Sequence, residues 1–263
     1  MWKIAILALG LAGACLAQTN RLTPAEEAAG WQLLFDGRSL NGWEDPARKS
    51  PPGNSFTVED GAIRVLAKPR IQEELFTTAV FGDFELLFDW RISPRGNSGL
   101  KYRIQDNVFV VRDPKIPRFE DLVEASLKNR PPRGERGQDY VIGFEYQVID
   151  RANSDAQRGA RQQAGALYDL VGPPSDPARP AGEWNQARVV LRGNHVEHWL
   201  NGVKVVDVAL DAPEIAQGLA ARWGAGSLVY GLLTRQPRRE TPISIQNHNN
   251  DAWFRNIKIR RLR

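Results

Sequence analysis

The sequence contains almost no cysteine. Its single cysteine, Cys15, lies in an N-terminal segment that we expect to be removed from the mature protein. A chain that begins after Ala17 has no thiol, which excludes disulfides, thiolate metal sites and a cysteine nucleophile. The candidates for chemistry are therefore carboxylate, imidazole, amide and cationic side chains.

Long apolar runs are also absent after the first 17 residues. Lys3 precedes an apolar run that ends at Leu16, and small residues occupy the positions that a signal peptidase reads before cleavage after Ala17. This layout is typical of a signal peptide over residues 1–17, because the run is too short and wrongly flanked for a membrane span. The alternative, an N-terminal helix in the core, lacks an amphipathic period and a cap.

The segment before Cys15 is a poor match to a bacterial lipoprotein box, because the large aliphatic Leu11 stands one place too far upstream. We therefore favour an exported product, periplasmic or extracellular, over one that is lipid-anchored at Cys15. No later segment is apolar enough to span a bilayer.

Several catalytic signatures are missing. The sequence has no phosphate-binding glycine-rich loop, no HExxH pair and no GxSxG elbow. It also lacks the E-x-D-x-x-E arrangement of sandwich glucanases, which argues against ordinary two-carboxylate glycosidase chemistry. The net charge is +4 and the arginines are spread along the chain, so nucleic acid is not an expected partner.

Short alternating segments make up most of the remaining sequence. Phe84–Ile92 alternates large apolar with mostly polar residues, which predicts a strand with one buried face. Asn201-Gly202 between two such segments is a strong hairpin signal. We expect one all-β, two-sheet sandwich domain over residues 18–263. Its other strands are expected at residues 31–35, 56–65, 100–104, 140–149, 188–191, 195–200, 203–208, 242–246 and 253–262.

Helical signals are few. Thr23 precedes a capped turn, and residues 213–222 favour a short helix. Residues 112–139 are rich in Pro, Arg and Gly, and they interrupt the succession of strands. We expect an inserted loop there that forms a flap or rim. Its one short helix is predicted by the helical spacing of Phe119, Leu122, Val123 and Leu127.

Polar residues occur where a sandwich strand is normally apolar. In the segment 143–150, Glu145 and Gln147 share one face, while Phe144 and Tyr146 share the other and can serve the core. A carboxylate beside an amide on a concave sheet is suited to binding a polyol. The alternative is that both side chains simply face solvent.

Two further candidates come from the turn and strand around residue 100. Asn97 lies between two glycines, where it is either a ligand for substrate or an ordinary turn residue. Strict alternation places Arg103 on the same face as Lys101. An arginine within a strand needs a partner or an anion, so Arg103 is a candidate for holding negative charge.

Trp184 precedes a predicted strand and is either a platform for a sugar face or a core tryptophan. His248 lies in a polar turn near Gln246 and Arg255. A lone histidine in a polar turn more often has no catalytic function, although the neighbouring Gln246 and Arg255 favour a role in the site. The remaining histidines, His195 and His198, flank a predicted surface strand.

Taken together, these motifs resemble the 3-keto-disaccharide hydrolase family. They follow the family's order over nearly the whole mature chain, from the opening segment GWQLLFDGRSLNGW at residues 30–43. The later motifs are residues 84–91, Asn97-Ser98-Gly99, Glu145-Tyr146-Gln147 with Asp150, Gly165–Tyr168, Glu183-Trp184-Asn185, His198–Gly202, Gln246 with His248, and Phe254–Ile257.

The resemblance implies an all-β, concanavalin-like jelly-roll sandwich of two antiparallel sheets, with one or two short helices in its loops. It also implies cleavage of glycosides that are already oxidised to a ketone at carbon 3. Two features depart from the family pattern. Asn249 follows His248 where the family usually has glycine, and the segment 112–139 is expanded.

This chemistry matches the residues present. A ketone at carbon 3 acidifies the hydrogen on carbon 2, so a base can remove it and the carbon 1 substituent leaves by β-elimination. Water can then add back, so hydrolase and lyase outcomes differ only after elimination. The route needs a base, a group that stabilises the enediolate, and an acid for the leaving group.

We hypothesise that Glu145 or His248 is the base and that Arg103 and Gln147 hold the developing negative charge. A divalent cation bound by Glu145 and His248 is conceivable, but no spacing pattern establishes it. The residues expected to bind a small carbohydrate substrate are Asn97, Gln147, Asp150, Tyr168, Trp184, Gln246 and Arg255. The main alternative function is a non-catalytic carbohydrate-binding module of the cell envelope. An ordinary glycoside hydrolase and an envelope domain with a vestigial site also remain open.

Overall fold

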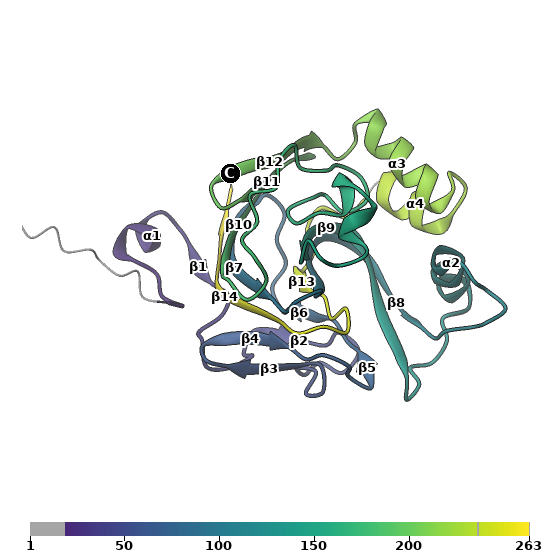
Figure 1. Cartoon of the computed structure of the whole chain (residues 1–263), viewed down its shortest axis with the longest axis horizontal. Helices are drawn as coiled ribbons and strands as arrows, with labels where there is room; N and C mark the ends of the chain where they lie inside the picture. Colours follow the sequence, from purple (N-terminus) through teal and green to yellow (C-terminus); the bar gives the residue numbers. More distant parts are fainter. Residues whose placement is uncertain (1–18, 236, 263) are drawn as a thin grey trace, which may run out of the picture.

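The computed structural model describes residues 19–235 and 237–262. In these ranges a pair of β-sheets face one another, and helices α2, α3 and α4 gather at one side, near β8 and β9 (Figure 1). The expected signal peptide of residues 1–17 lies outside the described residues. None of the helices in the described ranges combines the length and apolar character that crossing a membrane requires.

The larger sheet has eight strands in the order β12-β11-β10-β7-β14-β4-β3, with β1 also pairing with β14. Its strand pairs are antiparallel. The strands are β1 (Gln32–Leu33), β3 (Phe56–Glu59), β4 (Ala62–Val65), β7 (Phe84–Ile92), β10 (Asn185–Arg192), β11 (His195–Leu200), β12 (Val203–Ala209) and β14 (Ala252–Arg261).

The smaller sheet has six strands in the order β2-β6-β13-β8-β9-β5. One pair, β5 with β9, is parallel, which differs from the expected purely antiparallel arrangement. The strands are β2 (Trp43–Glu44), β5 (Ile71–Gln72), β6 (Leu75–Thr77), β8 (Asn97–Val110), β9 (Gly137–Ile149) and β13 (Ser244–Ile245). The two facing sheets confirm the expected all-β jelly-roll sandwich.

Period-two alternation builds the contact between the sheets. On the β7 side the buried residues are Phe84, Leu86, Phe88, Trp90 and Ile92, each at most 2% exposed, as their alternation predicts. Tyr146 of β9 faces them, and its ring meets that of Phe88 edge to face at 5.4 Å. Removing such apolar surface from water is the main stabilising contribution to a sandwich of this size.

The turn between β11 and β12 also follows the prediction. Asn201 and Gly202 have φ values of 48° and 82°. Positive φ at both positions is typical of the type I′ turn, whose twist matches that of the flanking strands.

His198 of β11 was expected beside a surface strand, and the structure shows otherwise. The imidazole is fully buried between the sheets. Its Nε2 lies 2.9 Å from the Tyr102 hydroxyl, and its Nδ1 lies 3.0 Å from the Gly165 carbonyl oxygen. Burial lowers the pKa of His198 to about 4, so the ring is neutral and has a structural role.

The helices are short. Helix α1 (Pro24–Ala28) begins with a capping box between Thr23 and Glu26. Helices α2 (Phe119–Asn129) and α3 (Pro213–Trp223) lie where the sequence predicts them, whereas α4 (Leu228–Thr234) was not predicted. Two 3₁₀ turns, η1 (Ala156–Arg158) and η2 (Ala160–Gln162), follow β9. Helix α2 packs against β8, and α3 packs against α4.

Candidate active site

A pocket lies on the outer face of the smaller sheet, opposite the face that packs against β7. Strands β8 and β9 form its floor, and the turn after β13 and helices α2 and α3 contribute to its walls. Its volume is ≈ 230 Å³. The lining is mostly polar and comprises Gln72, Glu74, Asn97, Phe119, Glu120, Gln138, Asp139, Tyr140, Glu145, Gln147, Arg158, Tyr168, Arg222, Gln246, Asn247 and His248.

A buried cation lies between two carboxylates at the floor of this pocket. Lys101 on β8 is opposite Glu145 on β9 in the strand register, so both side chains point to the same face. The Lys101 Nζ lies 3.9 Å from Glu145 Oε2 and 3.3 Å from Oε1 of Glu74, which precedes β6. Ser244 on β13 donates a hydrogen bond of 3.2 Å to the other Glu74 oxygen.

Burial sets the protonation of these groups. It raises the pKa of Glu145, an effect that the charges of Lys101 and Arg222 oppose. Burial also raises the pKa of Glu74 to about 7. The charge of Lys101 lowers the pKa of Glu74, and the charge of Glu145 raises it further. Burial alone lowers the pKa of Lys101, but the two carboxylates outweigh that effect and raise it. Lys101 therefore stays cationic, while the carboxylate pair can take up a proton near neutral pH.

Gly99 on β8 makes room for the catalytic carboxylate candidate. It lies opposite Gln147 and diagonal to Glu145. A Cβ atom at position 99 would collide with the Glu145 carboxyl group. A glycine is therefore needed at this position so that the carboxylate can lie across the strand.

The segment 165–168 runs along β9 and places Tyr168 next to Glu145. Gly165 N–H donates to the Gln147 carbonyl at 2.9 Å, and Tyr168 N–H donates to the Glu145 carbonyl at 3.0 Å. The Tyr168 hydroxyl donates to Asp155 at 2.9 Å. These bonds hold the phenol ring at the pocket wall.

Arg222, in the last turn of α3, brings a second cation to the pocket. Its guanidinium lies 5.2 Å from the centre of the Tyr168 ring and donates a hydrogen bond of 3.4 Å to the Tyr140 hydroxyl. Its Nε lies 3.5 Å from carboxylate oxygens of both Glu120 and Asp169. The nearby tyrosines and carboxylates keep Arg222 charged, because they outweigh the effect of burial and raise its pKa.

The turn after β13 presents His248 at the pocket mouth. Asn247 fixes this turn, since its Nδ2 donates to the Ser55 and Leu66 carbonyls and its Oδ1 accepts from Asn249 N–H at 2.8 Å. Asn249 has a φ of 68°, a left-handed conformation that glycine favours and asparagine tolerates. The departure from the family's usual glycine therefore preserves the shape of the turn.

His248 itself is exposed to solvent. The protein around the imidazole nevertheless desolvates it to some extent and, together with the charge of Lys101, lowers its pKa. The ring is thus neutral at pH 7 and able to accept a proton.

Two buried oxygens in the pocket are available for a ligand. Asn97 Oδ1 and Gln246 Oε1 are inaccessible to solvent, and neither has a hydrogen-bond partner among the described residues. Both residues line the pocket. Because buried acceptors are normally satisfied, each of these two oxygens lacks a donor, and a rotation of its side chain toward the pocket would present it to a sugar hydroxyl or an ordered water.

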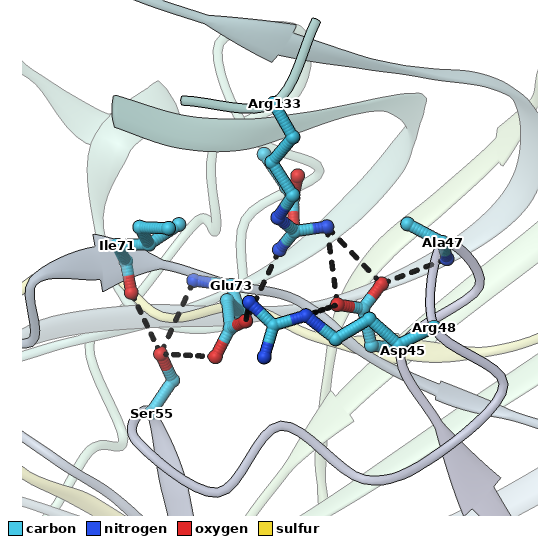
Figure 2. Close-up of polar contacts among 8 residues, drawn as sticks. Asp45, Ala47, Arg48, Ser55, Ile71, Glu73 and Arg133 are labelled. Atoms are coloured by element: carbon cyan, nitrogen blue, oxygen red, sulfur yellow. Dashed lines mark hydrogen bonds and ion pairs between the residues drawn. The ribbon is translucent and has the colours of Figure 1, made fainter. Parts of the chain in front are cut away.

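Arg133 anchors the loop that follows α2. Its guanidinium contacts the buried carboxylates of Asp45 at 3.1 Å and Glu73 at 3.2 Å, and Arg48 approaches Glu73 at 3.1 Å (Figure 2). Arg133 also contacts the buried carboxylate of Asp139 at 2.8 Å. Asp139 also lines the pocket, and burial raises its pKa to about 6. The cluster therefore connects the expanded loop to the pocket wall.

The structure brings most of the predicted site residues together. Phe144 and Tyr146 are buried in the core, while Glu145 and Gln147 face the pocket, as period-two alternation predicts. The predicted residues that line the pocket are Asn97, Glu145, Gln147, Tyr168, Gln246 and His248.

Arg103 lies outside the pocket, and its predicted position was wrong. The β8–β9 register shifts between Tyr102 and Asp106, and Arg103 has a φ of 52°. This bulge breaks the alternation with Lys101. The guanidinium instead donates to the Gly193 carbonyl and lies 3.6 Å from Asp83, so it does not face a ligand bound over Glu145.

Asp150, Trp184 and Arg255 are not among the lining residues either. Asp150 Oδ2 accepts a 2.6 Å hydrogen bond from Arg95 N–H, which closes the turn before β8. Trp184 precedes β10 and Arg255 lies on β14, so both belong to the larger sheet. There the Arg255 guanidinium covers the Trp184 ring at 3.9 Å, which leaves this face of the ring unavailable to a sugar.

Lys101, Glu74 and Arg222 were not predicted as site residues. One signal could have identified Lys101. It pairs directly with Glu145 across β8 and β9, so both side chains point to the same face of the sheet. Glu74 and Arg222 come from a short connection and from the end of a helix. Neither position has a sequence period that indicates which way the side chain points.

The pocket does not offer a compact set of metal ligands. In the described ranges of the chain, three potential metal ligands have their side-chain atoms close together: His195, Glu197 and Asp207, on the larger sheet. Lys204 already contacts both of its carboxylates. In the pocket, the Lys101 ammonium occupies the position between Glu74 and Glu145 where a cation would be held.

Comparisons with known proteins show the family and the fold of this chain. The 3-keto-disaccharide hydrolase of Bacteroides thetaiotaomicron is 29% identical, over 94% of this chain and 83% of that protein. A crystal structure of a candidate glycosyl hydrolase from Parabacteroides distasonis has a TM-score of 0.69 at 26% identity, covering 94% of this chain and 100% of the other. A second candidate glycosyl hydrolase from that organism shares the fold, with a TM-score of 0.58 at 21% identity. The match covers 88% of this chain and 99% of the other.

The family match covers the sandwich and the pocket. The family described as the 3-keto-alpha-glucoside-1,2-lyase-like domain matches residues 30–260. This range includes all the strands of both sheets except the last residue of β14. The chain is therefore a carbohydrate-active enzyme that belongs to the 3-keto-alpha-glucoside-1,2-lyase-like family, as the sequence motifs predicted.

Proposed function

We propose that this chain is exported and cleaves 3-keto-glycosides by removing the proton on carbon 2. The observation that carries the proposal is the Glu145 carboxylate, which is 13% exposed, has a raised pKa and lies 3.9 Å from Lys101 in a polar pocket. The name of the curated relative, a 3-keto-disaccharide hydrolase, supports this class of substrate.

Glu145 is the base in the first step. A carboxylate with a raised pKa holds a proton more strongly than an ordinary one, and so it is a better acceptor for a proton on carbon. Lys101 keeps the carboxylate ionised before the reaction. Because Lys101 is only 2% exposed, its role is to position and tune Glu145 rather than to touch the substrate.

Loss of the carbon 2 proton produces an enediolate with negative charge on the carbon 3 oxygen. Arg222 and the amide of Gln147 line the pocket and supply the positive charge and hydrogen bonds that stabilise it. Arg222 thus takes the role that the sequence assigned to Arg103. The acceptors Asn97 Oδ1 and Gln246 Oε1 bind sugar hydroxyls.

The second step breaks the bond between carbon 1 and the leaving oxygen. The proton on Glu145 passes to that oxygen, so the alcohol departs and an enone remains. In the hydrolytic outcome, neutral His248 takes a proton from water as the water oxygen adds to carbon 1. Carbon 2 receives a proton from solvent, and His248 releases its proton to solvent. The sum is one water consumed for each glycoside cleaved.

Incubation of the mature protein with a 3-keto-glucoside and with its unoxidised parent tests this function. We expect release of the alcohol from the keto sugar alone. Cleavage of the parent would instead indicate an ordinary glycoside hydrolase. Tight binding of the parent with no release from either compound would indicate a binding module. Either result would contradict the proposal.

A further inference from the structure

A second depression opens from the rim of the pocket. It lies between the 112–139 segment and the edge strand β5, and its volume of ≈ 700 Å³ exceeds the ≈ 230 Å³ of the pocket. Gln72, Phe119 and Gln138 line both. The two are therefore adjacent, and we call the second one the side groove. Its apolar lining residues are Val110, Pro114, Ile116, Pro117, Phe119 and Leu122.

The side groove differs chemically from the pocket. Most of the pocket lining consists of charged, amide and hydroxyl side chains, whereas half of the residues that line the side groove are apolar. Its charged residues are Arg70 and Arg112, which are exposed, and Asp113, which is half-buried; Arg70 is paired with Glu135. Apolar surface of this kind favours a flat hydrophobic ring over a hydroxylated one.

Phe119 marks the junction between the pocket and the side groove. It is the first residue of α2, and its half-buried ring packs edge to face against Tyr140 at 5.1 Å. Tyr140 is itself fixed beside Lys101, whose Nζ lies 5.1 Å from the tyrosine ring. A ring that leaves the pocket along the groove therefore meets a preformed aromatic surface.

We propose that the side groove binds the leaving group of the substrate and selects an aromatic aglycone. The inference rests on the proposed function, because it places the keto sugar over Glu145. With the sugar in the smaller pocket, its carbon 1 substituent has to extend beyond that pocket, and the side groove adjoins it at Gln72, Phe119 and Gln138. The expanded 112–139 segment is then a specificity element, which explains why it is held by Arg133 and its three buried carboxylates.

The test compares the 3-keto-glucosides of phenol and of 4-phenylphenol, which are leaving groups of similar acidity but different length. We expect kcat/KM to be about tenfold higher for the longer aglycone, the effect of burying roughly one further ring. Ile116→Ala and Phe119→Ala should each reduce this preference to about twofold or less. Val111→Ser, at an exposed residue directly before this segment that does not line the groove, is the matched control and should retain the preference.

Equal kcat/KM values for the two substrates in the wild-type protein would overturn the inference, as would variants that slow both substrates to the same extent. If neither substrate is cleaved, the proposed function fails instead. Calorimetric titration of 4-phenylphenyl glucoside against phenyl glucoside then tests the groove by itself. Tighter binding of the longer compound that Ile116→Ala removes supports the groove, and equal binding contradicts it.

Discussion

Lys101 and Glu145 face one another across the β8–β9 pair, with the lysine Nζ 3.9 Å from the carboxylate Oε2. Burial alone would protonate Glu145, and the neighbouring ammonium opposes this. The pair thereby holds an ionised base in a place that is largely shielded from water. Such a base is stronger than an exposed carboxylate.

Glu145→Gln removes the base while keeping the size and hydrogen-bonding shape of the side chain. We expect kcat on a 3-keto-glucoside to fall by at least ~100-fold, with the melting temperature unchanged or higher, because a buried carboxylate is lost. Steady-state kinetics and thermal unfolding check both. Glu214→Gln, at an exposed position in the first turn of α3, is the control. A rate in Glu145→Gln near that of Glu214→Gln would remove Glu145 from the mechanism.

Lys101→Met tests the tuning of the base. Without the ammonium, the pKa of Glu145 rises further, so the acid limb of the kcat/KM profile should move to higher pH. The free energy of unfolding should fall by about 3 kcal/mol, because buried carboxylates lose their partner. Lys128→Met, at an exposed lysine of α2, should leave both quantities unchanged. An unmoved acid limb in Lys101→Met would show that the lysine only packs.

The pH dependence of stability reports on Glu74. Its pKa rises from 4.5 to about 7 on folding, mainly through burial. Between pH 4.5 and pH 7 the carboxyl group is therefore protonated in the folded state and ionised in the unfolded state. The contribution of Glu74 to the free energy of unfolding is fully present below about pH 4.5 and is lost as the pH rises through about 7. Asp139, with a pKa of about 6, acts in the same direction.

Urea unfolding should therefore show a protein that is more stable at pH 5 than at pH 8, by on the order of 3 kcal/mol for Glu74. Glu74→Gln cannot titrate, and its stability should vary less over this interval. The pH dependence of stability that remains in this variant comes from Asp139 and Glu145. A variant as pH-dependent as the wild type would show that Glu74 does not take up the proton.

Gly99→Ala tests the close approach of β8 to the Glu145 carboxylate. The new Cβ would displace the carboxyl group, so we expect kcat/KM to fall about tenfold or more, as misplacement of a base does. Gly53→Ala is the matched control, because an added Cβ there meets nothing within 4 Å. Activity in Gly99→Ala equal to that in Gly53→Ala would mean that the carboxylate has a second productive position.

Arg133→Gln tests the anchor of the expanded loop. Removing one partner from three buried carboxylates should lower the free energy of unfolding by about 3 kcal/mol. Amide hydrogen exchange should also accelerate in residues 130–139 before it does so in β7. Arg136→Gln, at an exposed arginine of the same loop, should change neither. Uniform destabilisation without faster local exchange would show that Arg133 does not hold this loop specifically.

Sequence periodicity predicted the regions of the fold that follow a regular repeat. Phe84–Ile92 has the bounds and the buried face that its alternation indicates. The same argument placed Glu145 and Gln147 on the pocket face. It failed at Arg103, because the β8–β9 pairing is interrupted between Tyr102 and Asp106 and Arg103 has a positive φ, so its alternation with Lys101 does not continue.

Other site features depend on contacts between distant segments. Glu74 reaches Lys101 from a connection between two short strands, and Arg222 reaches the pocket from the end of α3. Trp184 and Arg255 occur in family motifs, yet strand order in the larger sheet places them together and outside the pocket. A pattern within one strand contains no information about which strand becomes its neighbour.

Exchange at carbon 2 is the measurement that tests the proposed chemistry most directly. Turnover of a 3-keto-glucoside in D₂O should produce 3-keto-glucose that carries deuterium at carbon 2, which NMR or mass spectrometry detects. Brief incubation with Glu145→Gln should introduce none beyond the uncatalysed background. Wild-type turnover that leaves the original hydrogen at carbon 2 would contradict proton abstraction by Glu145.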